Sequence, residues 1–144
     1  MLHCIENEVS GGLSTLVDGF TVTQKLKKDF PDFYKILSEI KVRFQFIDQS
    51  VVLEDWAEMI RLDENGDFKQ VRFSPRLDYV PMLDKEKLDL YYKARKKLSE
   101  MYNSDKYKIE FKLSAKDLIM MDNYRLLHGR TAYQASEGER FLQG

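Results

Sequence analysis

The sequence predicts a mainly β domain: an antiparallel sheet or barrel with helical insertions. Three observations predict this class. Val42, Phe44 and Phe46 alternate with polar residues, which indicates a half-buried strand. The segment 85–102 instead repeats apolar residues every three to four positions, which indicates an amphipathic helix. Helices and strands do not alternate regularly, so a parallel sheet of βαβ units is not expected.

The first forty residues predict two strands followed by two helices. Residues 1–9 are expected to form a strand, Gly11-Gly12 a turn, and residues 14–17 a second strand. A helix is expected to begin within 21–26, with lysines near its C-terminal end, where cations suit the helix dipole. Pro31 predicts the start of a second short helix, because proline fits the first turn.

The rest of the chain predicts strands on both sides of the long helix. Residues 56–62 and 68–73 are expected to form a hairpin, since the intervening Asp63-Glu64-Asn65-Gly66 favours a turn. Two more strands are expected at 107–113 and 118–121, and a final strand leads to His128 and the C-terminal segment.

Composition excludes several classes of protein. The 144 residues carry 23 Lys and Arg against 24 Asp and Glu, so charge gives no reason to expect a nucleic-acid or membrane partner. No apolar run is long enough to span a membrane. Two histidines and one cysteine, Cys4, exclude an internal disulfide and a four-ligand Cys/His zinc site. The sequence predicts a soluble cytoplasmic protein.

The chain is expected to be one incomplete domain over residues 1–144. It opens inside an apolar strand and stops at Phe141-Leu142-Gln143-Gly144 without polar punctuation. Both ends are therefore expected to have been cut from a longer protein.

Three residues are candidates for chemistry, and each has two interpretations. His128 is either a strand-end histidine hydrogen-bonded in the core or a metal ligand or acid–base group. Arg140 is either an ordinary solvated or ion-paired arginine, or a fork that holds a carboxylate bidentately. Ser14 either starts a strand or hydrogen-bonds a ligand carboxylate.

A complete iron site of the two-histidine, one-carboxylate type is not visible. The economical source of two such ligands is a His-x-Asp or His-x-Glu pair on one strand. No such pair occurs in the sequence, so His3 is expected to be a structural strand residue. The cationic stretches 25–28 and 95–97 are expected to be solvated helix faces.

Two blocks of sequence together carry a family resemblance. They are Leu2-His3-Cys4-Ile5 with Gly11-Gly12-Leu13-Ser14 and Val17-Asp18-Gly19-Phe20, and Asp122-Asn123-Tyr124-Arg125-Leu126-Leu127-His128-Gly129-Arg130 with Gly138-Glu139-Arg140-Phe141-Leu142-Gln143-Gly144. The chain resembles the Fe(II)- and 2-oxoglutarate-dependent dioxygenases that include taurine dioxygenase. The second block is similar to the branch formed by γ-butyrobetaine dioxygenase and trimethyllysine dioxygenase. The twelve-residue spacing of His128 and Arg140 fits the γ-butyrobetaine enzymes better.

The resemblance implies a fold and an activity. The fold is a double-stranded β-helix, a cupin-like jelly roll, with helical insertions near 20–40 and 84–103. The parent protein would hydroxylate a small quaternary-ammonium acid, with γ-butyrobetaine as the expected substrate and carnitine as its product. Fe(II) is the implied cofactor, 2-oxoglutarate and O₂ the co-substrates, and ascorbate a stimulant. The relatives also imply a homodimeric parent, mitochondrial if it acts on trimethyllysine.

The resemblance also implies residue roles. His128 matches the distal histidine of the iron triad, and Arg140 matches the arginine that pairs with the C5 carboxylate of 2-oxoglutarate. Ser14 falls where relatives place a Thr or Ser near that carboxylate. Gly144 stands where taurine-type relatives carry an arginine for a sulfonate, which speaks against a sulfonate substrate.

Departures from the family pattern limit these expectations. The family's His-x-Asp would precede Met1, as would most of the aromatic cage for trimethylammonium, and the last cage tyrosine would follow Gly144. Ser74 stands near the position where relatives have an asparagine that helps the substrate. The isolated chain is therefore expected to be inactive and to bind iron weakly. The alternatives are a non-enzymatic interaction module and a same-family dioxygenase with another substrate.

Overall fold

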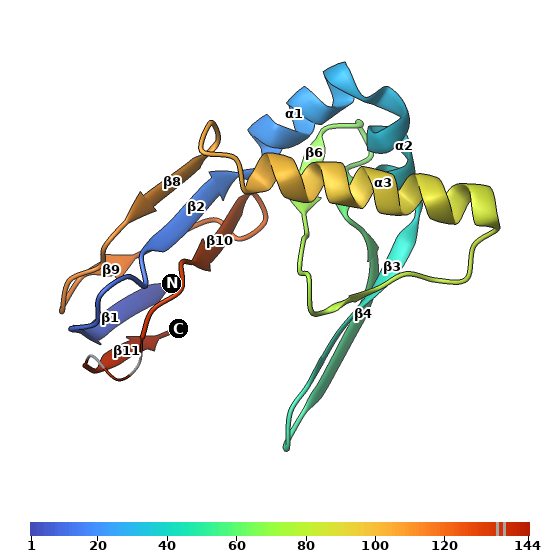
Figure 1. Ribbon diagram of the computed structural model, residues 1–144. Helices are drawn as coiled ribbons and strands as arrows, with labels where there is room; N and C mark the ends of the chain where they lie inside the picture. The colour runs from blue at the N-terminus through green and yellow to red at the C-terminus, as the bar shows by residue number, and fades with distance from the viewer. Residues whose placement is uncertain (135, 137) are drawn as a thin grey trace.

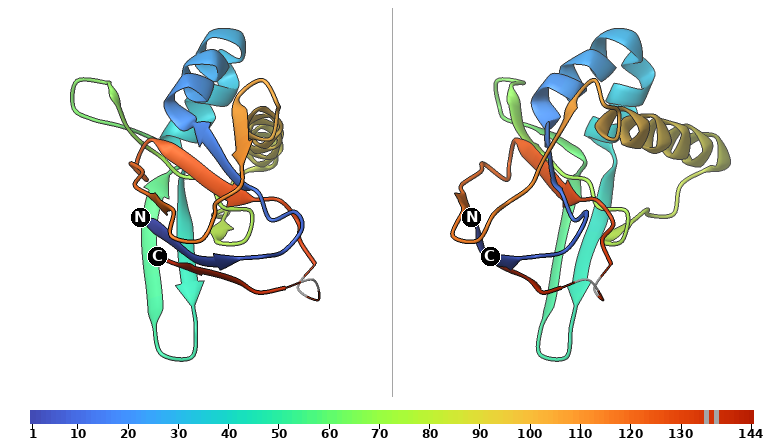
Figure 2. Two further views of the ribbon diagram at one scale, coloured as in Figure 1. Left: turned by 90° about the vertical axis from the view of Figure 1, so that its left-hand side faces the viewer. Right: turned by 60° about the vertical axis from the view of Figure 1, so that its left-hand side comes forward.

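The structure is a computed structural model that describes residues 1–134, 136 and 138–144. A strand-rich part and a helix-rich part lie next to each other (Figures 1 and 2). In chain order the elements are β1 (Leu2–Asn7), β2 (Ser14–Asp18), α1 (Gly19–Asp29), α2 (Pro31–Glu39), β3 (Lys41–Ile47), β4 (Val52–Glu58), β5 (Ile60–Leu62), β6 (Phe68–Val71), β7 (Asp78–Tyr79), α3 (Lys85–Tyr102), β8 (Lys108–Phe111), β9 (Leu118–Ile119), β10 (Leu126–Arg130) and β11 (Arg140–Gln143).

The strand-rich part consists of two antiparallel sheets. One has the order β11-β1-β9 and the other the order β10-β2-β8. Consecutive strands change sheet: β1 leads to β2 in the other sheet, and β8, β9, β10 and β11 alternate between the two. This double-sheet connectivity is that of a jelly roll. It confirms the predicted mainly β class with helical insertions.

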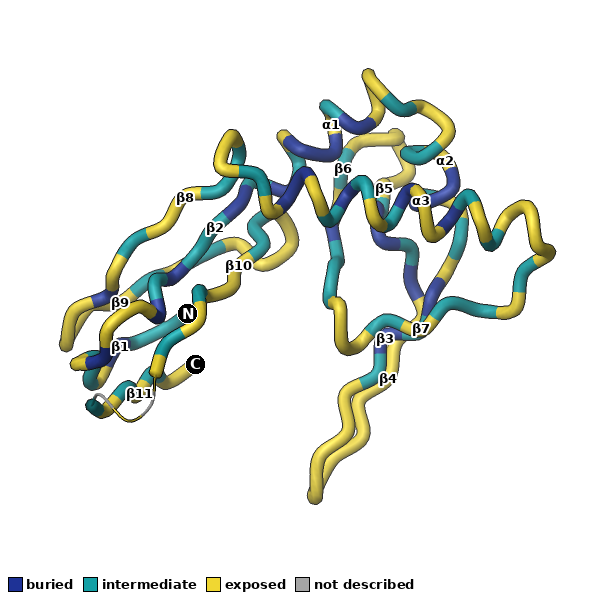
Figure 3. The backbone as a smooth tube through the Cα atoms, in the orientation of Figure 1, coloured by how far each residue is buried: buried dark blue, intermediate teal, exposed yellow. Residues whose placement is uncertain are grey.

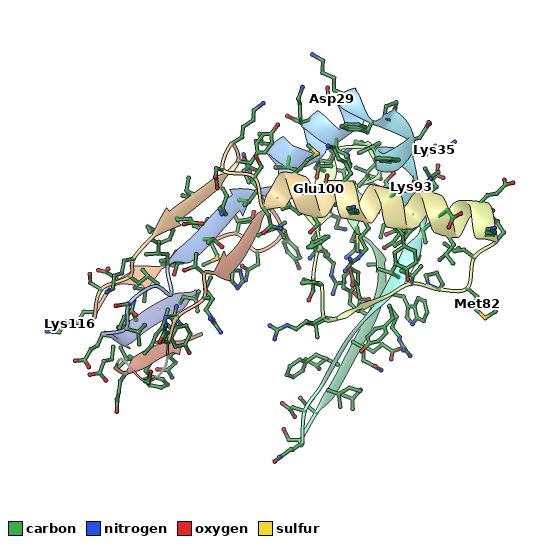
Figure 4. All side chains as sticks on the ribbon, viewed as in Figure 1. Asp29, Lys35, Met82, Lys93, Glu100 and Lys116 are labelled. Carbon is green, nitrogen blue, oxygen red and sulfur yellow. The ribbon has the colours of Figure 1, made fainter. Side chains whose placement is uncertain are left out.

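The helix-rich part is inserted between β2 and β8. Its core lies where α1, α2 and α3 pack against β3 to β6, and Figure 3 shows buried residues concentrated there. Tyr91, Ala94 and Leu98 of α3 are fully buried, as the period of the sequence predicts, whereas Lys93 and Glu100 are exposed (Figure 4). Each large apolar side chain buried in this way stabilises the fold by about 1.5–3 kcal/mol.

The predicted hairpin of residues 56–62 and 68–73 is only partly correct. β5 and β6 do pair around the expected turn, but residues 52–58 form β4, which pairs with β3 from Val52 opposite Ile47 to Glu58 opposite Lys41. Met59 is buried between β4 and β5 and accepts a hydrogen bond from the amide of Arg72. The segment 52–62 therefore contributes one strand to each of two different sheets.

The β3–β4 hairpin extends away from the body as an arm (Figure 1). Its inner end is buried through Val42 and Ala57. Its outer end is exposed along both strands (Figure 3). The exposed apolar residues of the arm are Phe46, Ile47, Val51, Val52, Leu53 and Trp56.

Arg95 contradicts the expectation that residues 95–97 form only a solvated face. Its guanidinium donates two hydrogen bonds, at 3.1 and 2.7 Å, to the carboxylate of Asp78, whose side chain is almost fully buried. Such a bidentate pair is strong and directional. It ties β7, which the sequence did not predict, to α3.

Asp18 joins the two parts at the end of β2. Its carboxylate accepts from the amides of Phe20 and Thr21, at 3.1 and 3.3 Å, and so caps α1. It also forms a bidentate pair with Arg125, at 3.2 and 2.6 Å, just before β10. At Gly19 an added Cβ would lie 2.8 Å from the carbonyl oxygen of Arg125. Only glycine allows this close approach.

Asp18→Asn tests this junction through pH. Bonding to Arg125 lowers the pKa of Asp18 to about 2 from its ordinary 3.8. A lowered pKa gives stability that is complete above about pH 4 and is lost as the pH falls toward 2. We expect urea unfolding of wild type to show this loss, and Asp18→Asn to be less stable at pH 7 by on the order of 1 kcal/mol, with a flatter acid profile.

Asp29→Asn is the matched control. Asp29 pairs with Lys25 within the exposed face of α1, where ion pairs contribute little. If Asp18→Asn shows the same loss of stability with falling pH as wild type, the Asp18–Arg125 pair does not stabilise the junction.

Candidate functional site

His128 lies on β10 in the middle of the second sheet. It is paired with Leu16 of β2 and is exposed. Within the described residues its imidazole makes no hydrogen bond, so the interpretation as a core histidine is wrong. The side chain borders two hollows of about 220 Å³ each, and Phe73 lines both. An exposed imidazole at the edge of a hollow is free to bind a ligand.

The strand register places Ser14 on the same face of the sheet as His128. Directly opposed residues share a face, as do residues two apart on one strand. His128 is opposite Leu16, and Ser14 is opposite Arg130. Ser14, Arg130 and His128 therefore share one face, with Ser14 nearly buried at the start of β2.

Arg140 comes from the other sheet, on β11 opposite Asn7 of β1. It is half-buried, as expected for a strand residue that points inward. Its Nη2 donates a long hydrogen bond of 3.4 Å to the carbonyl of Gly12, and its Nε is buried without a partner. Gly12 precedes Ser14 by two residues, so the guanidinium lies at the start of β2. The turn thus brings Arg140 toward the strand that carries Ser14.

Gly12 leaves the space that Arg140 occupies. Its φ is +59°, and an added Cβ would lie 3.0 Å from Arg140 Nε. Only glycine adopts such a φ without strain. Arg140 also acts on Cys4: burial raises the pKa of the Cys4 thiol, and the positive charge of Arg140 partly offsets that rise.

The residues fit a carboxylate better than a complete metal site. Among the described residues no group of three His, Cys, Asp or Glu could hold a metal ion. His128 supplies one imidazole, and His3 lies in β1 opposite Gln143, as expected of a strand residue. The guanidinium of Arg140, by contrast, has an unused donor and no carboxylate within 4 Å in the described part of the chain. Unsatisfied buried donors of this kind are costly unless a ligand uses them.

A larger hollow of about 390 Å³ lies beyond Phe73, on the face of the β3–β4 arm. Phe44, Phe73 and Ser74 line it. Arg72 borders both this hollow and one beside His128. Arg72 is held by an ion pair with Asp55 and by the ring of Phe44, 4.1 Å from its Cζ. Ser74 thus lies on a surface that is continuous with the surroundings of His128.

Sequence reasoning did not find Tyr133 or Phe73. Tyr133 lies beside Gly12 and under the guanidinium of Arg140, whose Cζ is 5.3 Å from the ring centroid. Phe73 packs edge-on against Tyr102, with ring centroids 5.5 Å apart. The aromatic character of both was visible, but Gly12 and Tyr102, which lie beside Tyr133 and Phe73 respectively, come from distant parts of the chain.

The whole described chain, including the strands that carry this site, matches a known protein family. The model of the family described as "Taurine catabolism dioxygenase TauD, TfdA family" matches residues 1–144. The chain belongs to this family. The match confirms the resemblance stated from the two sequence blocks.

The relatives include both enzymes of the expected branch. The chain is 38% identical over 151 residues to human γ-butyrobetaine dioxygenase, covering 100% of this chain and 38% of that protein. It is 27% identical over 138 residues to trimethyllysine dioxygenase of Meyerozyma guilliermondii, covering 92% of this chain and 35% of that one. The chain therefore spans a little over a third of the length of these relatives.

A solved structure supports the fold. A protein from Burkholderia xenovorans, described as an alpha-ketoglutarate dependent 2,4-D dioxygenase, matches with a TM-score of 0.71 at 18% identity. The match covers 99% of this chain and 58% of that chain. It agrees with the jelly-roll connectivity of the two sheets. Within the described residues, no helix is long and apolar enough to cross a membrane.

Gly12→Ala tests whether this glycine makes room for Arg140. Gly66 is the matched control, because its φ is also positive, at +83°, and nothing lies within 4 Å of its added Cβ. Both substitutions should cost about 1–2 kcal/mol of unfolding free energy from the left-handed backbone. Only Gly12→Ala should shift the NMR signal of the Arg140 Nε–H. Identical Arg140 signals in the two variants would show that Gly12 does not shape this site.

Proposed function

We propose that this chain is the part of a 2-oxoglutarate-dependent dioxygenase domain that holds the far carboxylate of 2-oxoglutarate and supplies one iron ligand. The observation that carries the proposal is the half-buried guanidinium of Arg140 beside Gly12, whose Nε has no hydrogen-bond partner among the described residues. Its planar fork suits bidentate binding of a carboxylate. Arg140 would hold the C5 carboxylate, and Ser14 would donate to the same group.

His128 is proposed as a ligand of Fe(II). It is exposed on the face that it shares with Ser14, and Phe73 separates it from the larger hollow. When bound, Fe(II) with 2-oxoglutarate and O₂ would supply the oxidising power for hydroxylation of a C–H bond. The protein contributes geometry: it orients the co-substrate through Arg140 and walls the site with Phe73 and Tyr102. Burial raises the pKa of Tyr102, so its phenol hydroxyl stays protonated and uncharged.

The substrate of the parent protein is proposed to be a small quaternary-ammonium acid, with γ-butyrobetaine converted to carnitine. Human γ-butyrobetaine dioxygenase is 38% identical to the whole chain. Gly144 further disfavours a sulfonate substrate. Trimethyllysine is the alternative, and its enzyme is also among the relatives. Ser74 would lie on the substrate side of Phe73.

The setting of the parent protein follows from the same resemblance. We propose a cytoplasmic homodimer stimulated by ascorbate, or a mitochondrial enzyme if trimethyllysine is the substrate. Charge balance favours neither a nucleic-acid nor a membrane partner.

One observation favours a second candidate function, a non-enzymatic interaction module. The described residues include no three-ligand metal group. The isolated chain is therefore proposed to be inactive and to bind Fe(II) weakly. A His-x-Asp or His-x-Glu encoded upstream of Met1 in the native transcript would favour the enzyme, and its absence the module.

His128→Ala tests the iron assignment in the parent protein. Loss of even an outer-shell partner of a metal ligand lowers affinity or activity by 10- to 100-fold, so loss of a ligand should lower 2-oxoglutarate turnover by more than about 100-fold. Release of succinate measures it. His3→Ala is the control and should retain turnover, since His3 is a strand residue of the other sheet.

The isolated 144-residue chain provides the complementary measurement. It should release no succinate above background. Succinate release by this chain that His128→Ala abolishes would contradict its proposed inactivity, and a parent enzyme indifferent to His128→Ala would contradict the ligand role.

A further inference from the structure

Tyr133 stands between the two arginines of the candidate site. The Cζ of Arg130 lies 4.6 Å from the ring centroid of Tyr133, and that of Arg140 lies 5.3 Å from it. Both distances are within the range of a cation–π interaction. Arg130 shares the sheet face of His128 and Ser14. One aromatic ring therefore contacts a cation from each of the two sheets.

Arg140 has little else to hold its guanidinium. Its described polar contact is the 3.4 Å hydrogen bond to Gly12, and Nε has no partner. In the described part of the chain, no carboxylate lies within 4 Å of Arg130 or Arg140. A free arginine side chain loses rotamer entropy when a ligand fixes it. A contact that restricts Arg140 before a ligand arrives lowers the entropic cost of binding.

Hydrogen bonds to residues 11–13 hold the backbone segment that carries Tyr133. Gly11 forms an antiparallel bridge with Tyr133, and the amide of Gly12 donates to the carbonyl of Ala132 at 3.0 Å. Leu13 and Thr131 are joined by two hydrogen bonds of 2.9 Å, one to a carbonyl and one to the Thr131 hydroxyl. Tyr133 is thus attached to the same turn that receives Arg140.

We propose that Tyr133 is a positioning residue that holds Arg140 ready for the far carboxylate of 2-oxoglutarate, with Arg130 as a second cation on the same ring. The inference rests on the proposed function, since it assumes that Arg140 receives this carboxylate. The ring face, rather than the phenol hydroxyl, does the positioning, because cation–π attraction comes from the ring quadrupole. Phenylalanine at position 133 should therefore preserve the positioning of Arg140, whereas leucine should not.

The test measures carboxylate binding by the 144-residue chain through NMR. The Nε–H group of Arg140 is buried. Its NMR signal can be assigned because it is lost in Arg140→Gln. Glutarate is the probe, because it carries the two carboxylates of 2-oxoglutarate without the keto group that would bind metal. Tyr133→Leu is expected to weaken glutarate binding about three- to fivefold, Tyr133→Phe to leave it within twofold, and Arg140→Gln to abolish it.

Tyr79→Leu is the matched control. Its ring also carries an arginine, with the Cζ of Arg43 at 4.9 Å, but it lies in β7, in the helix-rich part. This variant should bind glutarate like wild type. A loss as large as that of Tyr133→Leu would mean that any such substitution weakens binding, and would overturn the positioning role.

The remaining outcomes separate the two claims. If Arg140→Gln abolishes binding while Tyr133→Leu stays within twofold, the inference is wrong and the proposed function stands. If wild type does not bind glutarate, or Arg140→Gln binds as well as wild type, the carboxylate assignment fails and the inference with it. Equal loss in Tyr133→Phe and Tyr133→Leu would assign the effect to the hydroxyl and contradict the ring's role.

A second measurement is made on wild type and does not depend on any Tyr133 variant. An NOE between the ring protons of Tyr133 and the Nε–H of Arg140 should persist when wild type is saturated with glutarate. Loss of this NOE on binding would show that Arg140 leaves the ring to take its ligand, which overturns the inference.

Discussion

The ion pair between Asp18 and Arg125 marks the junction that sets how the helix-rich part meets the two sheets. It forms where β2 ends and α1 begins, and it reaches across to the turn that starts β10. The amide of Gly19 also donates to the carbonyl of Arg125 at 3.0 Å. The helix-rich part is thereby joined to the sheets at the strand pair that carries Ser14 and His128. A shift of this junction would move the site and the core together.

The candidate site contains several features that are unusual for a packed protein interior. The structure leaves a donor of Arg140 unsatisfied, places a glycine with positive φ beside it, and exposes an imidazole at the edge of a hollow. The unsatisfied donor of Arg140 costs stability in the free protein. Proteins keep such exceptions where a ligand compensates for them. Their concentration on two facing sheets distinguishes this region from the helical core, where side chains such as Tyr91 and Leu98 are fully packed.

The sequence predicted elements whose signal is local. The apolar period of α3, the proline at the start of α2 and the turn before β6 all agree with the structure. It did not predict that residues 52–58 pair with β3, because the choice of partner strand depends on packing far along the chain. His128, Arg140 and Ser14 were found by motif and spacing. Tyr133 was missed because its two arginines meet it only after the sheets form.

The β3–β4 arm has a consequence for the protein in solution. β4 is the outer strand of its sheet, and it exposes Leu53 and Trp56. Open strand edges invite pairing with another chain, and charged residues on the edge discourage it. Glu54 and Glu58 stand on this strand, so two arms that met edge to edge would bring like charges together. Salt or acid weakens that repulsion. We therefore expect ionic strength and acidity to affect whether two such arms pair edge to edge.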